Sequence, residues 1–281
     1  MNDKLKIIAG VVCDPISHSV SPRLHGYWLK KYNINGEYKA FHVKPEGLDK
    51  FIKTLASNNI SGVNLTVPHK ENALELVDIV DDAAQKIGAI NTVYRNENKQ
   101  LVGSNTDGYG FLKNLKQGTN DWHADHGPVA LIGSGGAARA IIDSLLNDGV
   151  PEIRLCNRTK ARAEKLALEV NDPRLTVYDW KDREGALKNA ALLVNVTTLG
   201  MTGQPELDLS LDHLPVTAVV YDIVYNPLQT NLLKAAKERG NITVDGLGML
   251  LHQAVPGFKA WFGVLPEVDD QLRDHVLEAL R

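Results

Sequence analysis

The sequence predicts an α/β protein with two domains. Short apolar runs that suit buried strands alternate with helix-forming segments over residues 7–115. A polar, turn-rich stretch at 116–127 interrupts this alternation, which resumes at residue 128. A glycine-rich turn at 133–136 then separates an apolar run from a helix-forming segment. These observations place a domain boundary near residue 116.

Composition allows two ordinary domains and excludes several classes of function. The chain has 281 residues, 43% of them hydrophobic, and a formal net charge of -3. That balance gives no reason to expect a nucleic acid or an anionic membrane as partner. The first residues make a poor signal peptide, and no apolar stretch is long enough to span a bilayer. Cys13 and Cys156 lie in apolar runs, so we expect buried thiols and a cytoplasmic protein.

The first domain is expected to contain a mixed sheet. Ser21 before Pro22 is a strong helix start, with serine as the cap and proline at the first helical position. Pro68 is expected to open another helix directly after a strand. Two alternating runs flank a turn at 96–98, which predicts a hairpin. The expected strands are 7–13, 38–43, 63–67, 89–95 and 100–104, and the expected helices are 21–32, 45–57, 68–80 and one ending near 115.

The second domain is expected to be a doubly wound, Rossmann-type sheet, because strands and helices alternate throughout it. The expected strands are 128–133, 152–157, 174–178, 191–196, 218–225 and 242–245, and the expected helices between them are 137–147, 159–170, 181–189 and 230–239. Two further helices are expected at 247–262 and 266–280.

The turn after the strand at 128–133 predicts a dinucleotide site. Gly133 and Gly135 match the first two glycines of the dinucleotide fingerprint, and Ala138 occupies the third position. A helix that starts here would direct backbone N–H groups and the positive end of its dipole at a phosphate. The alternative is a strand-to-helix turn whose glycines serve packing.

The end of the next strand favours NADP over NAD. An acidic residue about 20 residues after the glycine turn normally binds the ribose of NAD. This chain instead has Asn157, Arg158 and Thr159 there. A guanidinium suits the 2′-phosphate of NADP, although Arg158 could also be a solvated arginine at a strand end.

Three segments of the first domain carry candidate catalytic groups. Ser19 and Ser21 lie at a helix start, where hydroxyls and N–H groups can bind a carboxylate, although a serine there is often only a cap. Lys70 follows the strand at 63–67 and is expected in the first turn of a helix, whose dipole would favour its neutral form. Asp107 is expected at another helix start, as a partner of Lys70 or simply as a cap.

These segments, taken in order, resemble the shikimate dehydrogenase family, and the resemblance covers nearly the whole chain. Its motifs are Ser19-Val20-Ser21-Pro22, Asn64-Leu65-Thr66-Val67-Pro68-His69-Lys70, Ala89-Ile90-Asn91-Thr92, Asn105-Thr106-Asp107-Gly108, Gly133-Ser134-Gly135-Gly136-Ala137-Ala138-Arg139, Asn157-Arg158-Thr159, Tyr221-Asp222-Ile223-Val224-Tyr225 with Pro227, and 246–254.

The resemblance implies a cytoplasmic oxidoreductase of aromatic amino-acid biosynthesis that reduces 3-dehydroshikimate with NADPH and needs no metal. It implies catalysis by Lys70 and Asp107. The implied substrate-binding residues are Ser19, Ser21, Thr66, Asn91, Asp107, Tyr225 and Gln253. The implied cofactor-binding residues are Gly133, Ser134, Gly135, Gly136, Ala137, Asn157, Arg158, Thr159, Gly246 and Met249. It further implies a discontinuous substrate domain, 1–115 with 247–281, and an NADP domain at 116–246, in a monomer or homodimer whose lobes close on a small-molecule substrate.

The sequence departs from the family's pattern at two places, and three alternative functions remain open. Cys13-Asp14 stands where the family more often has glycine and a neutral polar residue, and Ser134 stands where alanine is usual. A quinate dehydrogenase or an aminoshikimate dehydrogenase could share this scaffold. A module that senses NADP(H) without turnover is the alternative from another class.

Overall fold

The computed structural model describes residues 6–14, 19–66, 68–119 and 122–280. Contacts divide the chain into two compact units, unit 1 with residues 1–106 and 253–281 and unit 2 with residues 107–252. The predicted boundaries, after residues 115 and 246, therefore differ from the observed ones. Helix α4 (Asp107–Gly118) packs on α5 (Gly136–Asp148), and Met249 of α8 (Leu247–Phe262) belongs to a core of unit 2. In the described part of the chain, no helix is long and apolar enough to cross a membrane.

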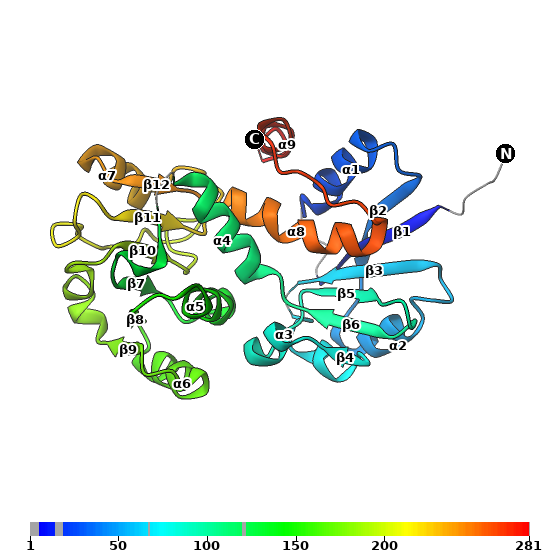
Figure 1. Ribbon diagram of the computed structural model, residues 1–281, viewed down its shortest axis with the longest axis horizontal. Coiled ribbons are helices and arrows are strands. Elements are labelled where there is room, and N and C mark those ends of the chain that lie inside the picture. The colour runs from blue at the N-terminus through cyan, green and yellow to red at the C-terminus, as the bar shows by residue number, and fades with distance from the viewer. Residues whose placement is uncertain (1–5, 15–18, 67, 120–121, 281) are drawn as a thin grey trace. The chain divides into compact units, whose positions relative to one another are not determined.

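Unit 1 is built on a mixed sheet, as predicted, but the sheet has six strands where five were expected (Figure 1). Its strands are β1 (Ile7–Cys13), β2 (Gly36–His42), β3 (Ile60–Leu65), β4 (Ile79–Val80), β5 (Thr92–Arg95) and β6 (Leu101–Ser104), in the order β2-β1-β3-β5-β6-β4. β1 pairs in parallel with β2 and β3, whereas β5 is antiparallel to β3 and β6. The carboxyl ends of β1, β3 and β6 therefore share the edge at which β5 begins.

Helices cover both faces of this sheet. On one face, α2 (Leu48–Lys53) and α3 (Asp82–Ile87) pack on strand residues such as Val63. On the other, α1 (Ser21–Lys31) and the end of α8 contribute His25, Trp28, Phe258 and Trp261 to an aromatic cluster. Gly62 permits this approach, because a Cβ there would overlap the Trp261 ring. With glycine at position 62, the indole Nε1 of Trp261 reaches the sheet and donates to the backbone carbonyl of Val93 at 3.0 Å.

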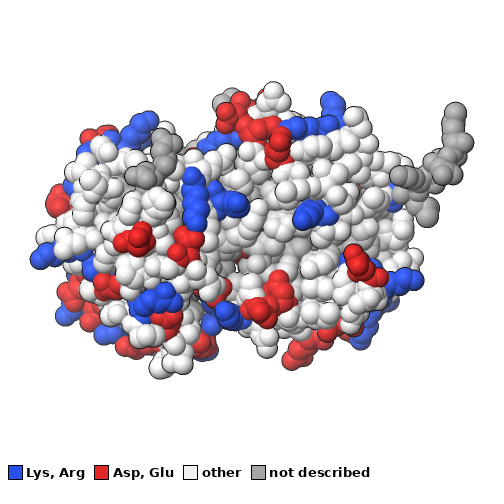
Figure 2. All heavy atoms as spheres, viewed as in Figure 1, with Lys and Arg blue, Asp and Glu red and all other residues white. Residues whose placement is uncertain are grey.

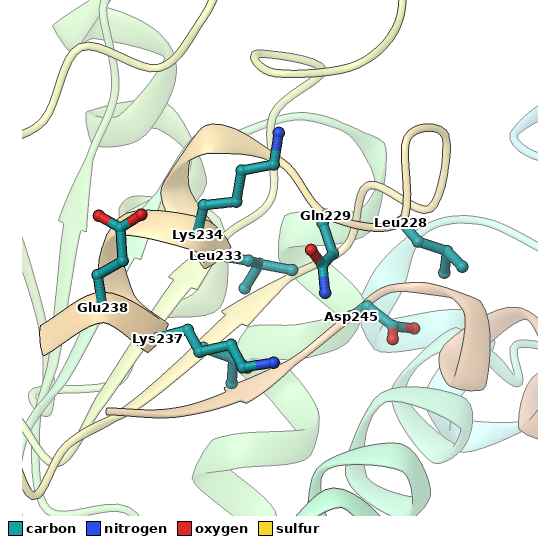
Figure 3. Close-up of a pocket in the computed structure, with 8 residues that line it drawn as sticks. Leu228, Gln229, Leu233, Lys234, Lys237, Glu238 and Asp245 are labelled. Atoms are coloured by element: carbon teal, nitrogen blue, oxygen red, sulfur yellow. The ribbon is translucent and has the colours of Figure 1, made fainter. Parts of the chain in front are cut away.

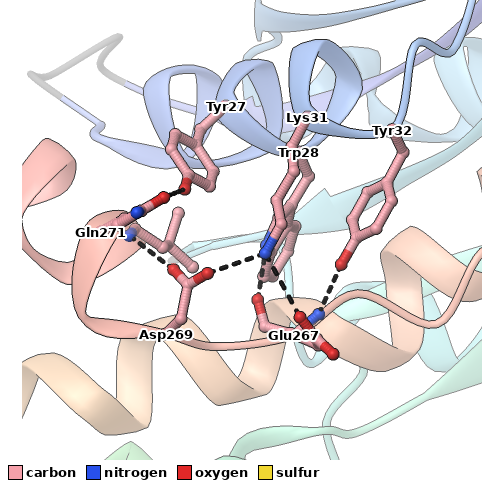
Figure 4. A network of polar contacts seen from close by, with 8 residues as sticks. Tyr27, Trp28, Lys31, Tyr32, Glu267, Asp269 and Gln271 are labelled. Atoms are coloured by element: carbon pink, nitrogen blue, oxygen red, sulfur yellow. Dashed lines mark hydrogen bonds and ion pairs between the residues drawn. The ribbon is translucent and has the colours of Figure 1, made fainter.

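The last segment of the chain is fastened to α1 (Figure 4). Trp28 Nε1 donates to the carbonyl of Glu267 at 2.9 Å, and the backbone N–H of Glu267 donates to the Tyr32 hydroxyl at 3.0 Å. Lys31 Nζ lies 2.7 Å from Asp269, which also caps helix α9 (Asp270–Leu277). Residues at the two ends of the sequence thus complete one unit.

Unit 2 is a doubly wound parallel sheet, as predicted. Its strands are β7 (Val129–Ile132), β8 (Ile153–Cys156), β9 (Leu175–Tyr178), β10 (Leu192–Asn195), β11 (Val219–Asp222) and β12 (Ile242–Val244), in the order β12-β11-β10-β7-β8-β9. All its strand pairs are parallel. The order reverses between β7 and β10, which makes their carboxyl ends the expected ligand crevice of this sheet.

Two cores cover the faces of this sheet. Leu131 and its neighbours pack under α4, α5 and α6 (Lys160–Val170), whereas Ile132 belongs to a core with α7 (Asn231–Arg239). Consecutive residues of β7 thus enter opposite cores, so the strand is apolar throughout. This explains why its short apolar run was recognisable in the sequence.

The prediction of a helix at 68–80 is wrong. Residues 68–70 form a turn, followed by the 3-10 helix η2 (Asn72–Glu75) and by β4. The Lys70 carbonyl accepts from the Ile90 N–H at 2.8 Å rather than from a helical neighbour. Asp78 is drawn to β6, because its carboxylate accepts from the Leu101 N–H at 2.7 Å. The dipole argument for Lys70 therefore does not apply, and Val67 lies outside the described residues.

Other elements are shorter than expected or were missed. The segment 45–57 forms η1 (Pro45–Gly47) and α2, and 181–189 holds only η4 (Trp180–Asp182) and η5 (Gly185–Leu187). Neither α3 nor β4 was predicted, and η3 (Ala124–His126) lies in the stretch predicted to link the domains.

Figure 2 shows basic and acidic side chains interspersed on the face drawn there.

Candidate active site

Asn91 is the centre of the candidate site in unit 1. It precedes β5 and is 3% exposed. Its Oδ1 accepts from the Thr106 N–H at 3.0 Å and from the Thr92 hydroxyl at 2.9 Å. Its backbone carbonyl accepts from the Leu65 N–H at 2.8 Å, next to Thr66. Thr66, Asn91 and Thr106, from three separate motifs, thus lie together at the carboxyl edge of the sheet.

The same edge binds the backbone of Lys70 and of Thr106, the residue before Asp107. The Lys70 carbonyl is bonded to the N–H of Ile90, the residue before Asn91. Thr106, bonded to Asn91, directly precedes Asp107. Adjacent Cα atoms are about 3.8 Å apart, so the start of α4 is tied to Asn91 by connectivity, although contacts group Asp107 with unit 2. Asp107 is 6% exposed at the first position of that helix.

The two serines lie together at the start of α1. Ser19 Oγ accepts from the Ser21 N–H at 3.3 Å, and both residues are half-buried. Ser21 was expected to be the helix cap, but the structure has Val20 there, without a side-chain capping bond. Ser21 is instead the first helical residue, which leaves its hydroxyl without a capping role.

Gln253 and Tyr225 belong to different units. The backbone carbonyl of Gln253, the first residue of the returning segment of unit 1, accepts from the Thr106 hydroxyl at 2.8 Å. Gln253 is thereby brought to the Asn91 edge. Tyr225 follows β11 in unit 2 and is half-buried, and burial raises the pKa of its hydroxyl.

The predicted glycine turn of unit 2 is open on its ligand side. It follows β7 at the point where the strand order reverses, and α5 begins at Gly136. A Cβ on Gly135 or Gly136 would meet no atom of the described chain within 4 Å. Gly133 has φ +113°, and a Cβ there would lie 2.6 Å from Thr197. Gly133 is thus required by backbone geometry, whereas the next glycines leave room for a phosphate.

Two further features of this turn fit a dinucleotide. Ser134 Oγ is buried and has no hydrogen-bond partner among the described residues. Its backbone N–H donates to Asn157 Oδ1 at 3.2 Å, and Asn157 Nδ2 donates to the Thr159 carbonyl at 2.8 Å. Asn157 therefore joins the glycine turn to exposed Arg158 and Thr159. The residues present fit NADP: the start of α5 would hold the pyrophosphate, and Arg158 would hold a 2′-phosphate.

The remaining predicted cofactor residues are placed differently. Ala137 lies in the first turn of α5, next to the glycine turn. Gly246 precedes α8, where a Cβ would overlap the backbone of Ile223. The Met249 side chain is 9% exposed and packs in the core of unit 2.

Sequence reasoning missed a buried network beside the glycine turn. Asn195, at the end of β10, donates to Asp222 at 3.0 Å and accepts from the Thr197 N–H at 3.1 Å. Asp222 also accepts from the Thr230 hydroxyl at 2.7 Å, yet burial raises its pKa to about 6. This network holds the segment that faces Gly133. The sequence feature that indicates this network is a polar residue at the end of each of two apolar strands, Asn195 in β10 and Asp222 in β11.

A cavity of about 250 Å³ lies elsewhere on unit 2 (Figure 3). It is lined by Leu228, Gln229, Leu233, Lys234, Lys237, Glu238, Thr243 and Asp245. The residues come from α7, the segment before it, and the end of β12. β12 is three strands from β7, or about 14 Å at ordinary strand spacing, so this cavity is separate from the glycine turn.

A doubly wound sheet with an open glycine turn at its switch point defines a dinucleotide-dependent enzyme of the α/β class. Comparisons agree with that class. Residues 11–93 match the shikimate dehydrogenase substrate binding domain, and residues 116–200 match the shikimate / quinate 5-dehydrogenase family.

Curated relatives cover nearly the whole chain. Shikimate dehydrogenase (NADP(+)) of Paramagnetospirillum magneticum is 55% identical over 96% of this chain and 98% of its own. The shikimate 5-dehydrogenase of Thermus thermophilus, solved with NADP(H) and shikimate, is 35% identical with a TM-score of 0.85, over 97% of this chain and 99% of that one. Quinate dehydrogenase from Corynebacterium glutamicum, solved with NAD, is 28% identical with a TM-score of 0.89, over 97% and 99%. The chain belongs to the shikimate dehydrogenase family and is an NADP-dependent oxidoreductase.

Proposed function

We propose that the protein reversibly reduces 3-dehydroshikimate to shikimate with NADPH, using Lys70 and Asp107 as an acid–base pair. One observation carries this assignment: Lys70, Asn91 and Thr106 are bonded to one edge of unit 1, and Asp107 is the next residue of the chain. Family membership supports the same reaction.

The proposal gives unit 1 the substrate and unit 2 the cofactor. Ser19 and Ser21 bind the substrate carboxylate with paired hydroxyls at a helix start. Four residues are proposed to hold the ring hydroxyls, namely Thr66, Asn91, Asp107 and Gln253, and Tyr225 is proposed as a further substrate-binding residue. Unit 2 is proposed to bind NADP through Gly133, Ser134, Gly135, Gly136, Ala137, Asn157, Arg158, Thr159, Gly246 and Met249.

The chain's own groups handle orientation and the proton. NADPH supplies the hydride when bound. Lys70 Nζ donates a proton to the carbonyl oxygen on which negative charge develops, and regains it in the reverse reaction. Asp107 orients Lys70 and couples to its titration. Asn91 holds the ring so that the reacting carbon is correctly presented.

Absorbance at 340 nm tests the assignment directly. The purified protein is assayed with shikimate and with quinate, each against NADP⁺ and NAD⁺. We expect turnover with shikimate and NADP⁺ to exceed every other combination, because Arg158 replaces the acidic residue that NAD-dependent enzymes use. Reduction of NADP⁺ no faster with shikimate than without it overturns the assignment.

The same assay decides between the alternatives. A preference for quinate makes the protein a quinate dehydrogenase, the activity named for one structural relative. Tight NADPH binding without turnover of shikimate, quinate or aminoshikimate makes it a sensor. The buried free thiols Cys13 and Cys156 support our proposal of a cytoplasmic protein. Light scattering distinguishes the proposed monomer from a homodimer.

A further inference from the structure

A line of hydrogen bonds crosses the sheet of unit 1 from Tyr38 to Asn91. The Tyr38 hydroxyl on β2 donates to Asn64 Oδ1 on β3 at 2.7 Å. Asn64 Nδ2 donates to the Thr92 hydroxyl at 3.0 Å and to the Asn91 carbonyl at 3.1 Å. The Thr92 hydroxyl donates to Asn91 Oδ1 at 2.9 Å. Tyr38 belongs to none of the motifs noted in the sequence, whereas its three partners come from two of them.

The strand register explains how these groups meet. Asn64 and Thr92 are directly opposed across β3 and β5. Val11 on β1 is opposite Asn64, and Ala9, two residues earlier, is opposite Tyr38. Tyr38 and Asn64 therefore point to the same face, and their side chains meet across β1.

Every bond in this line has a fixed direction. The Asn91 carbonyl can only accept, so Asn64 must present Nδ2 to it, and its Oδ1 then faces Tyr38. The Thr92 hydroxyl accepts from Asn64 and must donate its single hydrogen to Asn91 Oδ1. The Thr106 N–H is another donor to that oxygen, and the Thr106 hydroxyl, which donates to the Gln253 carbonyl, lies 3.2 Å from it. The acceptor atom of Asn91 is thereby occupied, and its side chain can contact a ligand only as a donor through Nδ2.

An aromatic stack holds the far end of the line. The His25 ring lies 3.9 Å from the Tyr38 ring at an interplanar angle of 8°. His25 is fully buried and, among the described residues, neither ring nitrogen has a hydrogen-bond partner. It therefore packs as a neutral ring and does not compete for the Tyr38 hydroxyl.

We infer that Tyr38 and Asn64 are positioning residues that set the amide of Asn91 as a hydrogen-bond donor to the substrate. The inference rests on the proposed function. Neither residue is catalytic, because the polar bonds of their side chains are internal and they act through Thr92 and Asn91. If the Asn64 amide were rotated by about 180°, its oxygen would face the Asn91 carbonyl oxygen, and two acceptors would repel each other. The hydrogen bonds therefore favour one orientation of the side-chain amides of Asn64 and Asn91.

Thr92 provides a matched pair of variants. Thr92→Val keeps the shape but removes the hydroxyl, and Thr92→Ser keeps the hydroxyl. We expect Thr92→Val to raise the KM for shikimate about tenfold at saturating NADP⁺, with kcat and the KM for NADP⁺ changed less than about twofold. Thr92→Ser should restore the KM to within about twofold of wild type. A KM for shikimate that is unchanged in folded Thr92→Val overturns the inference.

Tyr38→Phe tests the far end, because the phenyl ring keeps the stack on His25 and removes only the hydroxyl. We expect a three- to tenfold higher KM for shikimate, the range for about one neutral hydrogen bond. The double variant Tyr38→Phe/Thr92→Val should resemble Thr92→Val alone, because both break the same line. Tyr221→Phe is the control: it removes a buried hydroxyl bonded to Asn114 at 2.6 Å in unit 2 and should leave this KM unchanged.

Calorimetric binding of shikimate without cofactor separates the possible failures. Folded Thr92→Val and Tyr38→Phe with wild-type affinity and KM overturn the positioning role while the proposed function stands. A wild-type protein that neither binds nor turns over shikimate overturns both, because Asn91 then has no such substrate to orient. Equal losses in Tyr38→Phe and Tyr221→Phe also overturn the positioning role, since a general stability effect would explain them.

Discussion

Asn91 in unit 1 directly precedes a strand and the Gly133–Gly136 turn in unit 2 directly follows one, and the two regions are built in different ways. Asn91 is buried and held by side-chain bonds from Thr92 and by the Thr106 backbone. At the glycine turn, Gly135 and Gly136 offer open space, and Arg158 nearby is exposed. One region specifies a ligand with oriented side chains, and the other with exposed backbone.

The difference follows from the ligands that the two regions are proposed to bind. A small polyhydroxylated ring offers hydroxyl groups in many directions, so fixed donors and acceptors are needed to select one. A pyrophosphate carries diffuse negative charge, which backbone N–H groups and a helix dipole bind without any particular side chain. Substitutions should therefore affect chemistry and selectivity in unit 1, and mainly cofactor affinity in unit 2.

The largest effect is expected in unit 1, from Lys70→Ala. Loss of the proposed proton donor should lower kcat by roughly 10²–10⁴, with a smaller change in KM. Steady-state kinetics with shikimate and NADP⁺ measure this. Lys86→Ala, at an exposed position of α3, is the control and should leave kcat unchanged. Near-normal kcat in Lys70→Ala would show that Lys70 is not the proton donor, and the proposed difference in catalytic role between the two regions would then be wrong.

Arg158→Ala should give the largest effect in unit 2. The loss of a charge-assisted hydrogen bond to the 2′-phosphate should weaken NADPH about tenfold or more. NADH lacks that phosphate, so its affinity should scarcely change. Fluorescence titration with both cofactors gives the ratio. Equal weakening of the two would make Arg158 a structural residue.

Gly135→Ala should weaken both cofactors by roughly similar factors, about fivefold to tenfold, because the added methyl fills space proposed for the pyrophosphate. The free protein should keep its stability, since a Cβ at Gly135 meets no described atom within 4 Å. Gly26→Ala, whose Cβ also enters open space, is the matched control. Unchanged cofactor affinity in Gly135→Ala would mean that the turn serves packing alone.

The fourth effect concerns the stability of unit 1 rather than turnover or cofactor affinity. Burial lowers the pKa of His25 from 6.5 to about 3, so the native state binds fewer protons than the unfolded chain between these values. The stability due to neutral His25 is complete above about pH 6.5 and is lost as pH falls towards 3, at up to about 1.4 kcal/mol per pH unit. His25→Phe removes this dependence.

Urea unfolding of wild type and His25→Phe at pH 7.5, 6.0 and 5.0 checks this sign. The variant should gain stability relative to wild type as pH falls through this range. Asp222, whose raised pKa has the opposite effect on stability over part of the range, is present in both proteins and cancels in the difference. A difference that is constant with pH would show that His25 is protonated at little cost.

The predictable parts of the molecule are those whose structure depends on neighbouring residues. The glycine turn, the hairpin strands β5 and β6, and the parallel sheet of unit 2 follow from local patterns of apolar runs and turns. The clustering of Thr66, Asn91 and Thr106 was implied by ordered motifs, and the structure supplies its hydrogen bonds.

Long-range bonds explain what the sequence did not predict. Pro68 and the residues after it have a helix start signal, but the bonds from Lys70 to Ile90 and from Asp78 to Leu101 draw that segment to other strands. Tyr38 carries no local signal of a role near Asn91. Its partner Asn64 is 26 residues away, and only the strand register brings them together.

The fastening of residues 267–269 to α1 has a consequence for biosynthesis. Unit 2 is continuous, so it can fold while the nascent chain is still attached to the ribosome, whereas unit 1 must await a segment that is translated last. Pulse proteolysis of stalled chains should find residues 107–252 protected before residues 6–106. Equal protection of both would show that α1 acquires its packing without that final segment.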